Sequence, residues 1–379
     1  MKSYNRDRLE FRARALYNGY PIVDECSVFA PFVKEAPSDE RESQVLCDDL
    51  YGRFFTTGFQ DCLHYPYGQT VKMPFYNNGL TRYPEIIDEL RVPYRRIPIF
   101  KVKDLNDIKL FTDVMKDKNP DNIILFRGQN KLYLIDRPKE EKDWLFGDEN
   151  VKEPSFLPSF LRPNQKFAYT TLCSSWHQLA SILLNDLNHD NNDVIPPYLR
   201  SMEEFHTFAL GIAQHYGLPS VGIDLTDNLE TALWFAINYL KVGSGTTTCE
   251  VIGEEAKDAT IYVFRCDKRA IFKYNFGLEK FAGNHRPLAQ NAWFHHGGWG
   301  LARNQIALQL MCGFRVNQSW NETLPSNYYN TLFPSRDDDY FLDFLIKMQA
   351  WFEGSKVGEL LKGLYYCKAD HVMLDEARS

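Results

Sequence analysis

The sequence has no long hydrophobic run. No apolar stretch approaches the roughly 20 residues that a membrane-spanning helix needs. Residues 1–8 (MKSYNRDR) include no apolar segment of the kind found in a secretory signal peptide. We therefore expect a cytoplasmic protein that does not associate with a membrane.

The sequence also lacks paired cysteines. It contains eight cysteines, but no two of them have the C-x-x-C spacing of a zinc site or a redox motif. In a reducing compartment such residues are free thiols. We expect neither a disulfide framework nor a bound metal.

Positive charge is not in excess. The 43 Lys and Arg residues are outnumbered by 50 Asp and Glu residues, which gives a formal net charge of −7. Non-specific nucleic-acid binding requires dense positive charge, so the balance argues against it but leaves room for a local basic cleft. A hydrophobic content of 44% in a chain of 379 residues is ordinary for a globular protein with a large core.

Several familiar catalytic loops are absent. We find no phosphate-binding Walker A loop, no dinucleotide fingerprint followed by a helix, and no Gly-x-Ser-x-Gly nucleophile elbow. The function must therefore be sought in other motifs.

The sequence divides into three regions. Residues 1–95 suggest an accessory lobe, with a short helix at 9–16 and a loop-rich stretch at 65–93. Residues 96–318 form the expected core domain, and residues 319–379 form a tail with a helical segment near 341–364.

The first half of the core domain is expected to contain three strands and a helix. Residues 97–102 suggest a strand, which must be an edge strand or a strand start because Pro98 has no amide hydrogen. Residues 104–115 show the periodicity of an amphipathic helix. Residues 122–126 are a buried strand. Residues 132–135 would be its partner across a tight turn, followed by a long surface loop at 138–165.

The second half begins with a helix-capping pattern. Residues 201–204 (SMEE) form a capping box, and the helix that follows ends at Gly217. Residues 221–225 are the next strand. Asp227 and Glu230 repeat the capping pattern for a helix that reaches about residue 240.

The elements expected between residues 244 and 314 include a loop and two strands. We expect a flexible loop at 244–258, a strand at 261–266 and an alternating strand at 304–314. Because strands and helices interleave without regular βαβ spacing, the sequence favours an α+β fold over a doubly wound sheet.

Two polar signatures stand beside predicted strands. Residues 126–129 (FRGQ) close the strand at 122–126, and residues 214–226 (QHYGLPSVGIDLT) run from a helix end through a strand. The segment 232–236 (ALWFA) continues the second signature into a helix. Polar residues at strand ends are where binding sites are usually built.

These signatures resemble those of the FRG domain family, which is named for its Phe/Tyr-Arg-Gly motif. The resemblance covers roughly residues 98–314 and departs from the family pattern at 220–222 and at Leu225. The FRG pattern is in turn similar to an ADP-ribosyltransferase layout. It therefore implies an α+β fold with an ADP-ribosyltransferase-like split mixed sheet and flanking helices.

The resemblance also implies site residues. Arg127 would hold the ribose or diphosphate of NAD, because a planar guanidinium pairs two phosphate oxygens at once. The catalytic residues would be Arg127, Asp224, Thr226 and Gln305, with Gln309 as an alternative on the same third strand. NAD would be bound by Arg127, Gly128, Gln129, His215, Tyr216 and Asp224.

The implied function is NAD-dependent transfer of ADP-ribose to a protein or nucleic acid, in the context of a bacterial toxin or antiviral-defence effector. An antitoxin or regulatory protein is a possible partner of residues 1–95. Residues 304–314 contain no Gln-x-Glu or Glu-x-Glu. A non-catalytic module that binds a nucleotide or a partner, and an NAD glycohydrolase, are therefore alternatives.

Structural roles are open for the same residues. Arg127 can be a buried arginine paired with Asp224, whereas His215 and Tyr216 can cap and pack a helix. Thr226 and Asp227 are typical helix-cap residues.

A second cluster lies further along the chain. Residues 295–300 (HHGGWG) indicate a mobile glycine-rich loop rather than a metal site. Arg286 and Arg303 flank this loop and can bind phosphate.

Overall fold

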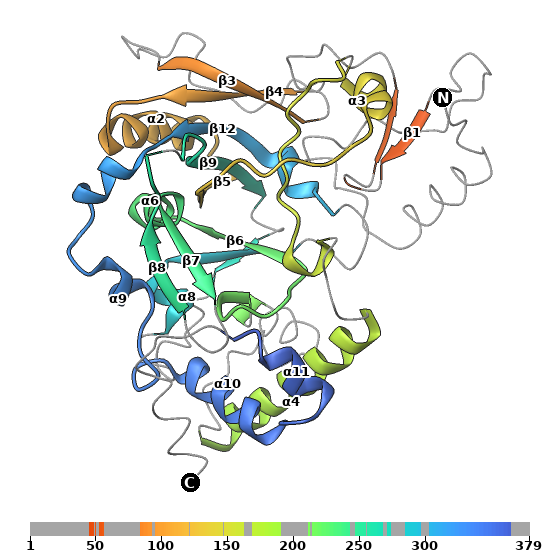
Figure 1. Ribbon diagram of the computed structural model, residues 1–379, viewed down its shortest axis with the longest axis vertical. Helices are drawn as coiled ribbons and strands as arrows, with labels where there is room; N and C mark the ends of the chain where they lie inside the picture. Colours follow the sequence, from red (N-terminus) through yellow and green to blue (C-terminus); the bar gives the residue numbers. More distant parts are fainter. Residues whose placement is uncertain are drawn as a thin grey trace.

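The computed structural model shows an α+β protein built on one mixed sheet (Figure 1). It describes residues 84–364 apart from 93–94, 121, 147, 163–168, 191–210, 213, 243–246, 255, 268–270, 274–284 and 297–302. It also describes residue 50 and two short strands, β1 (Val45–Asp48) and β2 (Arg53–Thr56). The expected helix at 9–16 and the capping box at 201–204 lie outside these residues.

The central sheet has the strand order β10-β11-β6-β5-β9-β12-β4-β3. Its pairs are antiparallel except for β12 with β4, which are parallel. A separate hairpin joins β7 to β8. The strands are β3 (Glu85–Val92), β4 (Arg95–Lys101), β5 (Asn122–Gln129), β6 (Gly222–Thr226), β7 (Asn238–Val242), β8 (Thr247–Val251), β9 (Thr260–Asp267), β10 (Ile271–Lys273), β11 (Ala292–His296) and β12 (Leu310–Arg315).

Helices flank the sheet and extend below it in Figure 1. The α-helices are α2 (Leu105–Lys118), α3 (Lys139–Phe146), α4 (Tyr169–Asp190), α6 (Leu229–Ile237), α8 (Arg286–Ala289), α9 (Tyr328–Leu332), α10 (Tyr340–Trp351) and α11 (Lys356–Leu361). The 3-10 helices in the described part of the chain are η4 (Ser159–Leu161), η6 (Gln305–Gln309) and η7 (Gln318–Thr323). No described helix is long and apolar enough to cross a bilayer.

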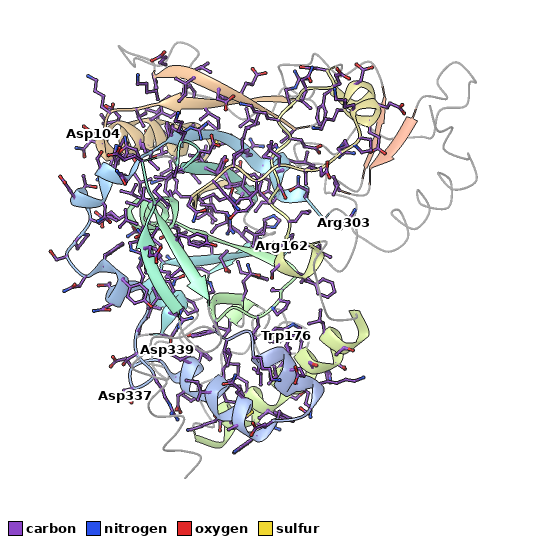
Figure 2. All side chains as sticks on the ribbon, viewed as in Figure 1. Asp104, Arg162, Trp176, Arg303, Asp337 and Asp339 are labelled. Atoms are coloured by element: carbon purple, nitrogen blue, oxygen red, sulfur yellow. The ribbon has the colours of Figure 1, made fainter. Side chains whose placement is uncertain are left out.

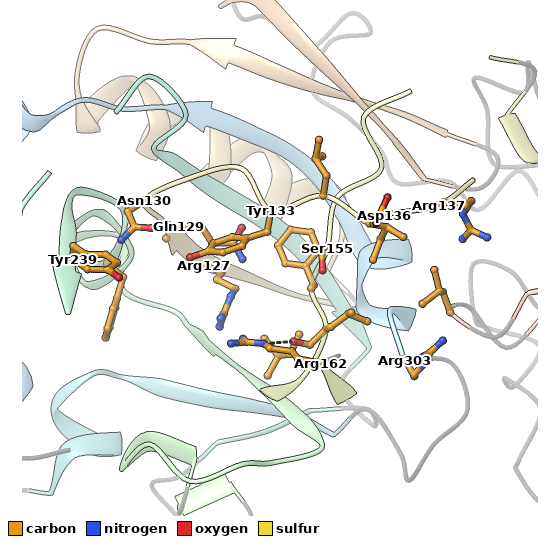
Figure 3. Close-up of a pocket in the computed structure, with 18 of the residues that line it drawn as sticks. Arg127, Gln129, Asn130, Tyr133, Asp136, Arg137, Ser155, Arg162, Tyr239 and Arg303 are labelled. Carbon is orange, nitrogen blue, oxygen red and sulfur yellow. Dashed lines mark hydrogen bonds between the residues drawn. The ribbon is translucent and has the colours of Figure 1, made fainter. Parts of the chain in front are cut away.

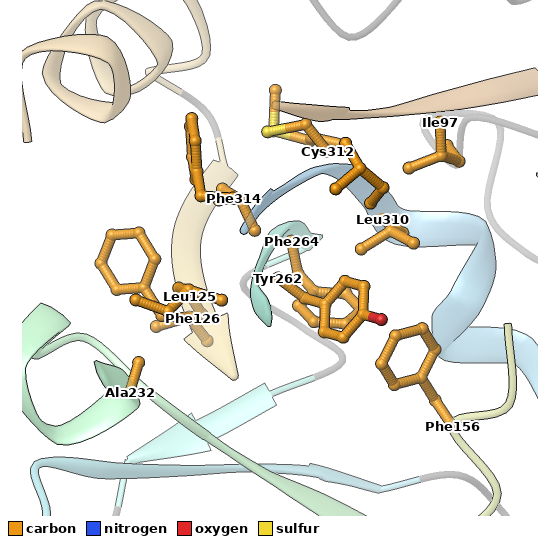
Figure 4. Packing of buried hydrophobic residues seen from close by; sticks show 14 of the residues in the cluster. Ile97, Leu125, Phe126, Phe156, Ala232, Tyr262, Phe264, Leu310, Cys312 and Phe314 are labelled. Atoms are coloured by element: carbon orange, nitrogen blue, oxygen red, sulfur yellow. The ribbon is translucent and has the colours of Figure 1, made fainter. Parts of the chain in front are cut away.

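The main core lies between the sheet and the helices α2 and α6 (Figure 4). Phe111 of α2 packs edge-on against Phe314 of β12, with ring centroids 5.5 Å apart. Phe156 contacts both Tyr262 and Phe264 of β9 at 5.1 Å. Burying a side chain of this size contributes about 1.5–3 kcal/mol, so this core ties strands of distant sequence into one unit.

A second core forms below the sheet. Helices α4, α10 and α11 pack with residues 216–221 and with Phe294 of β11. The C-terminal region expected at 319–379 is thus attached to the core domain through its helices. The helical prediction for 341–364 is confirmed.

The first part of the core domain differs from the sequence expectation in four places. Residues 85–92, expected in a loop-rich accessory lobe, form β3 of the central sheet. Strand β4 lies between β12 and β3 rather than at an edge, and its pairing with β12 covers only Ile99–Lys101, beyond Pro98. Residues 132–135 make only an isolated bridge, from Leu134 to Pro154. Residues 138–165 hold α3 and buried side chains instead of a surface loop.

The second part differs in three places. Helix α6 ends at Ile237, and its N-cap is Asn228 rather than Asp227. Residues 247–251, expected in a flexible loop, form β8. The expected strand at 304–314 is the 3-10 helix η6 followed by β12. These errors share a cause, because alternation and capping residues read alike in several backbone conformations until tertiary contacts choose one.

Candidate functional site

Two adjoining cavities lie beside the end of β5. The smaller has a volume of about 190 Å³ and the larger about 800 Å³. Both are lined by Arg127, Gly128 and Phe235. Small-molecule sites usually measure roughly 300–1,000 Å³, so a large ligand would need the larger cavity and could extend into the smaller one.

The smaller cavity collects most of the residues predicted from sequence. It lies where β5 and β6 separate, since these strands pair only at Phe126 and Thr226. The predicted site residues that line it are Arg127, Gly128, His215, Asp224 and Thr226.

Arg127 bridges the two strands at this separation. Its Nη1 donates to the backbone oxygen of Asp224 at 2.5 Å, and its buried Nε has no partner among the described residues. Burial lowers the pKa of Arg127, the Asp224 carboxylate raises it, and nearby Arg162 lowers it. The predicted pairing with Asp224 thus exists, but it runs through the backbone carbonyl rather than the carboxylate.

Asp224 lies beside a buried histidine. Its Oδ1 lies 3.1 Å from Nε2 of His215, and its side chain is 24% exposed. The Nδ1 of His215 faces Oε1 of Gln290 at 3.1 Å, while Nε2 of Gln290 donates to the Leu332 oxygen. Because that donation fixes the orientation of the Gln290 amide, Nδ1 of His215 must carry a proton.

Thr226 belongs to the same network and to the start of α6. Its hydroxyl donates to the backbone oxygen of Gln290 at 2.8 Å and accepts from the Asn228 amide at 3.0 Å. The Asn228 side chain accepts from the Thr231 amide. Thr226 is therefore a helix-start residue whose position depends on Gln290.

Asp227 turns away from both cavities. Its Oδ2 accepts from Lys273 and from the Trp293 indole, each at 2.9 Å. It is neither the cap of α6 nor a lining residue.

Gly128 lets β5 approach α6. A Cβ at this position would overlap the backbone oxygen of Ala232 and lie 2.6 Å from the Ala236 nitrogen. The two sequence signatures, at 126–129 and 214–236, therefore pack against each other and also line the cavities.

The larger cavity contains Gln129 and several arginines (Figure 3). Arg137 is neutralised there by a bidentate contact with the buried Glu153, at 2.8 and 2.9 Å. Arg162 and Arg303 also line this cavity, and Figure 2 shows both on the same side of the molecule. Arg303 is thus placed where the sequence expectation of phosphate binding is physically possible.

Tyr216 lies elsewhere. It is fully buried, lines neither cavity, and donates to the Asp339 carboxylate at 2.6 and 2.7 Å. The guanidinium of Arg286 stacks 4.4 Å from the Tyr216 ring, and the backbone amide of Arg286 also donates to Asp339. The structure therefore gives Tyr216 the predicted packing role and Arg286 a buried structural role. Neither is placed to contact a ligand in these cavities.

The residues expected to supply a catalytic glutamine from a third strand lie in a 3-10 helix instead, and Gln309 lines neither cavity. Gln305 begins η6, and Gln309 ends that helix with its Nε2 3.2 Å from Nε2 of His295. His295 and His296 belong to β11, while the rest of the glycine-rich stretch lies outside the described residues.

Two residues at the cavities were missed by sequence reasoning. Gln290 follows the one-turn helix α8, and Arg162 follows η4. Neither stands in a recognisable motif, so only their folded positions reveal them. Across the described residues, no group of three His, Cys, Asp or Glu side chains is arranged to hold a metal ion.

No family model, curated protein or solved structure matches the chain.

Proposed function

We propose that the chain is an NAD-dependent ADP-ribosyltransferase of the FRG type. One observation carries this proposal: Arg127 and Asp224, 97 positions apart in the sequence, come together in one cavity with His215 and Thr226. The single residue pair that joins β5 to β6 supports a split sheet of the ADP-ribosyltransferase kind.

The dinucleotide would span both cavities. Its nicotinamide end would enter the smaller cavity beside Asp224, and its adenylate would occupy the larger one. Arg127, which lines both, would lie at the diphosphate between them, where its fork can pair phosphate oxygens. Gln129, which lines the larger cavity, would contact the adenylate half.

The reaction breaks the bond between the ribose C1′ and the nicotinamide nitrogen, and the electron pair leaves with neutral nicotinamide. Positive charge grows on the ribose, where a fixed carboxylate stabilises it. Asp224 is the only carboxylate that lines the smaller cavity among the described residues. The nucleophile of a macromolecular target then attacks C1′ and loses its proton.

The biological context follows from the same resemblance. A bacterial toxin or antiviral-defence effector would act on a protein or nucleic-acid target, and residues 1–95 would bind that target or an antitoxin. The net charge of −7 favours a protein target, because a nucleic acid would be repelled outside a local basic cleft.

The test is incubation of the purified full-length chain with cell lysate and NAD labelled on the adenylate. We expect label on a macromolecule, and its sensitivity to protease or nuclease identifies the target class. Arg127→Ala should abolish labelling, whereas Arg336→Ala, which removes an arginine that pairs with Asp343 and lines neither cavity, should not. Thermal melting verifies that both variants fold. Labelling that persists in Arg127→Ala would overturn the site assignment.

A non-catalytic binding module is the second candidate. The observation that favours it is that Asp224 already contacts His215 and that no glutamate lines the smaller cavity in the described part of the chain. NAD binding without nicotinamide release would support this candidate. Release of free ADP-ribose without labelling would indicate an NAD glycohydrolase.

A further inference from the structure

Two arginines from separate elements converge on one wall of the larger cavity. Arg127 extends from the end of β5 and Arg162 from the residue after η4 (Figure 3). They are close enough for the charge of Arg162 to lower the pKa of Arg127. Arg303 also lines this cavity but lies on the opposite side of the view from Arg127.

No carboxylate contacts either guanidinium of this pair among the described residues, although the Asp224 carboxylate is near enough to raise the pKa of Arg127. Arg127 donates to the Asp224 backbone oxygen and Arg162 donates to the Leu157 backbone oxygen. Within the described residues, neither guanidinium forms an ion pair with a carboxylate. Arg137 in the same cavity differs, because Glu153 neutralises it.

Adjacent like charges repel, and their repulsion grows in a partly buried site. A dianionic ligand between them would relieve this repulsion and supply acceptors for two guanidinium forks. Arg162 is exposed and can therefore reach a ligand that enters from solvent.

The same cavity offers surfaces for a base. Tyr239 is 46% exposed as a residue and lines the cavity together with Asn130. Aromatic rings at such positions stack on bases. The ring of Tyr133 is less suitable because Lys131 already lies 4.9 Å from its centroid.

We infer that Arg162 and Arg127 together clamp the diphosphate of a nucleoside-diphosphate ligand in the larger cavity, with Arg162 as a binding residue outside both sequence signatures. This inference rests on the proposed function only for the identity of the ligand as NAD.

The experiment is calorimetric titration of the full-length chain with ADP-ribose, ADP, pyrophosphate and adenosine. Arg162→Gln should weaken ADP-ribose and ADP binding roughly 10–100-fold, the range expected for losing a charge-assisted hydrogen bond. Arg162→Lys should recover only part of this loss because lysine lacks the fork. Arg336→Gln removes the same charge outside both cavities, where Arg336 pairs with Asp343, and it should change binding by less than roughly threefold because no direct contact is lost. Adenosine should bind equally to the wild type and to Arg162→Gln.

The outcomes separate this inference from the proposed function. Equal weakening by Arg162→Gln and Arg336→Gln, or no effect of Arg162→Gln on any phosphate-bearing probe, would overturn the clamp. If nicotinamide is released from NAD and Arg162→Gln leaves KM unchanged, the clamp fails while the enzyme proposal stands. If ADP-ribose binds through Arg162 but no nicotinamide is ever released, the clamp stands and the enzyme proposal fails.

Discussion

Gly128 of β5 lies against the backbone oxygen of Ala232 in α6, at a distance that leaves no room for a side chain. The two residues come from different sequence signatures, so one backbone contact links them. The contact also places Arg127, the neighbour of Gly128, at the wall that both cavities share.

Gly128→Ala should destabilise the protein by about 1–3 kcal/mol or more, because the added methyl group forces β5 and α6 apart. The free energy of unfolding in urea measures this effect. Gly363→Ala is the matched control, since a Cβ there meets its nearest atom at an ordinary 3.4 Å, and it should change stability by no more than about 0.5 kcal/mol. A Gly128→Ala protein as stable as the wild type would contradict the close contact.

Asp224→Asn should reduce nicotinamide release by about 10²-fold, the usual effect of removing one preorganised electrostatic group from a transition state. Steady-state kinetics with NAD measure the effect, which should fall mainly on kcat. Asp227→Asn removes the next carboxylate in the sequence, which binds Lys273 and Trp293 outside the cavities. Equal losses in the two variants would show that charge in general, rather than the cavity carboxylate, matters.

Gln290→Leu should destabilise the protein and change which ring nitrogen of His215 carries a proton. The substitution leaves the Leu332 oxygen and Nδ1 of His215 without their contacts to Gln290, which costs about 1–3 kcal/mol in a buried site. Nitrogen NMR of the His215 ring should show a protonated Nδ1 in the wild type and an altered protonation pattern in the variant.

The control for this experiment is Gln349→Leu, which removes another glutamine that donates to a backbone oxygen, that of Leu361. Its His215 spectrum should match the wild type. A wild-type spectrum without a proton on Nδ1 would refute the orientation assigned to Gln290.

His285 should make stability fall in acid. Burial, together with the nearby charge of His215, lowers the pKa of His285 to about 4. Because the unfolded chain binds this proton more tightly, near pH 6.5, the contribution of His285 is complete above that pH and is lost as the pH falls toward 4. The full loss amounts to about 3 kcal/mol.

His285→Asn provides the comparison, since asparagine keeps a side-chain acceptor for the Leu288 amide at the start of α8 but does not titrate. Between pH 7 and 4, the wild type should lose about 3 kcal/mol more of its unfolding free energy than this variant. Parallel pH profiles of the two proteins would mean that His285 is not buried as a neutral side chain.

Much of the local structure was predictable because short-range interactions specify it. Asp104 caps α2 by accepting from the amides of Asn106 and Asp107, and the apolar period of that helix is visible in the sequence. Gly217 adopts a φ of 91°, as its predicted position after a helix end requires. The buried strands β5, β6 and β9 were also recognised, because each is a short β-branched or aromatic run.

The grouping of the site was predictable only in part. The signatures identified Arg127, His215, Asp224 and Thr226, which the cavity brings together. The signatures wrongly placed Tyr216 in the same site. His215 and Tyr216 are adjacent in the chain, but His215 faces Asp224 whereas Tyr216 donates to Asp339. Side-chain direction at a helix end depends on what packs there, and sequence spacing does not contain that information.

The sequence by itself therefore determined α2, α6, the strands β4, β5, β6 and β9, the helical character of residues 341–364, and the α+β class. Tertiary structure alone decided the strand order, the 3-10 course of residues 305–309, and the roles of Gln290 and Arg162. The physical reason is the sequence separation over which each kind of interaction acts. Caps and periodicity act within a few residues, whereas strand pairing and buried polar contacts join residues tens to hundreds of positions apart, where the gain in packing must exceed the entropy of closing the loop.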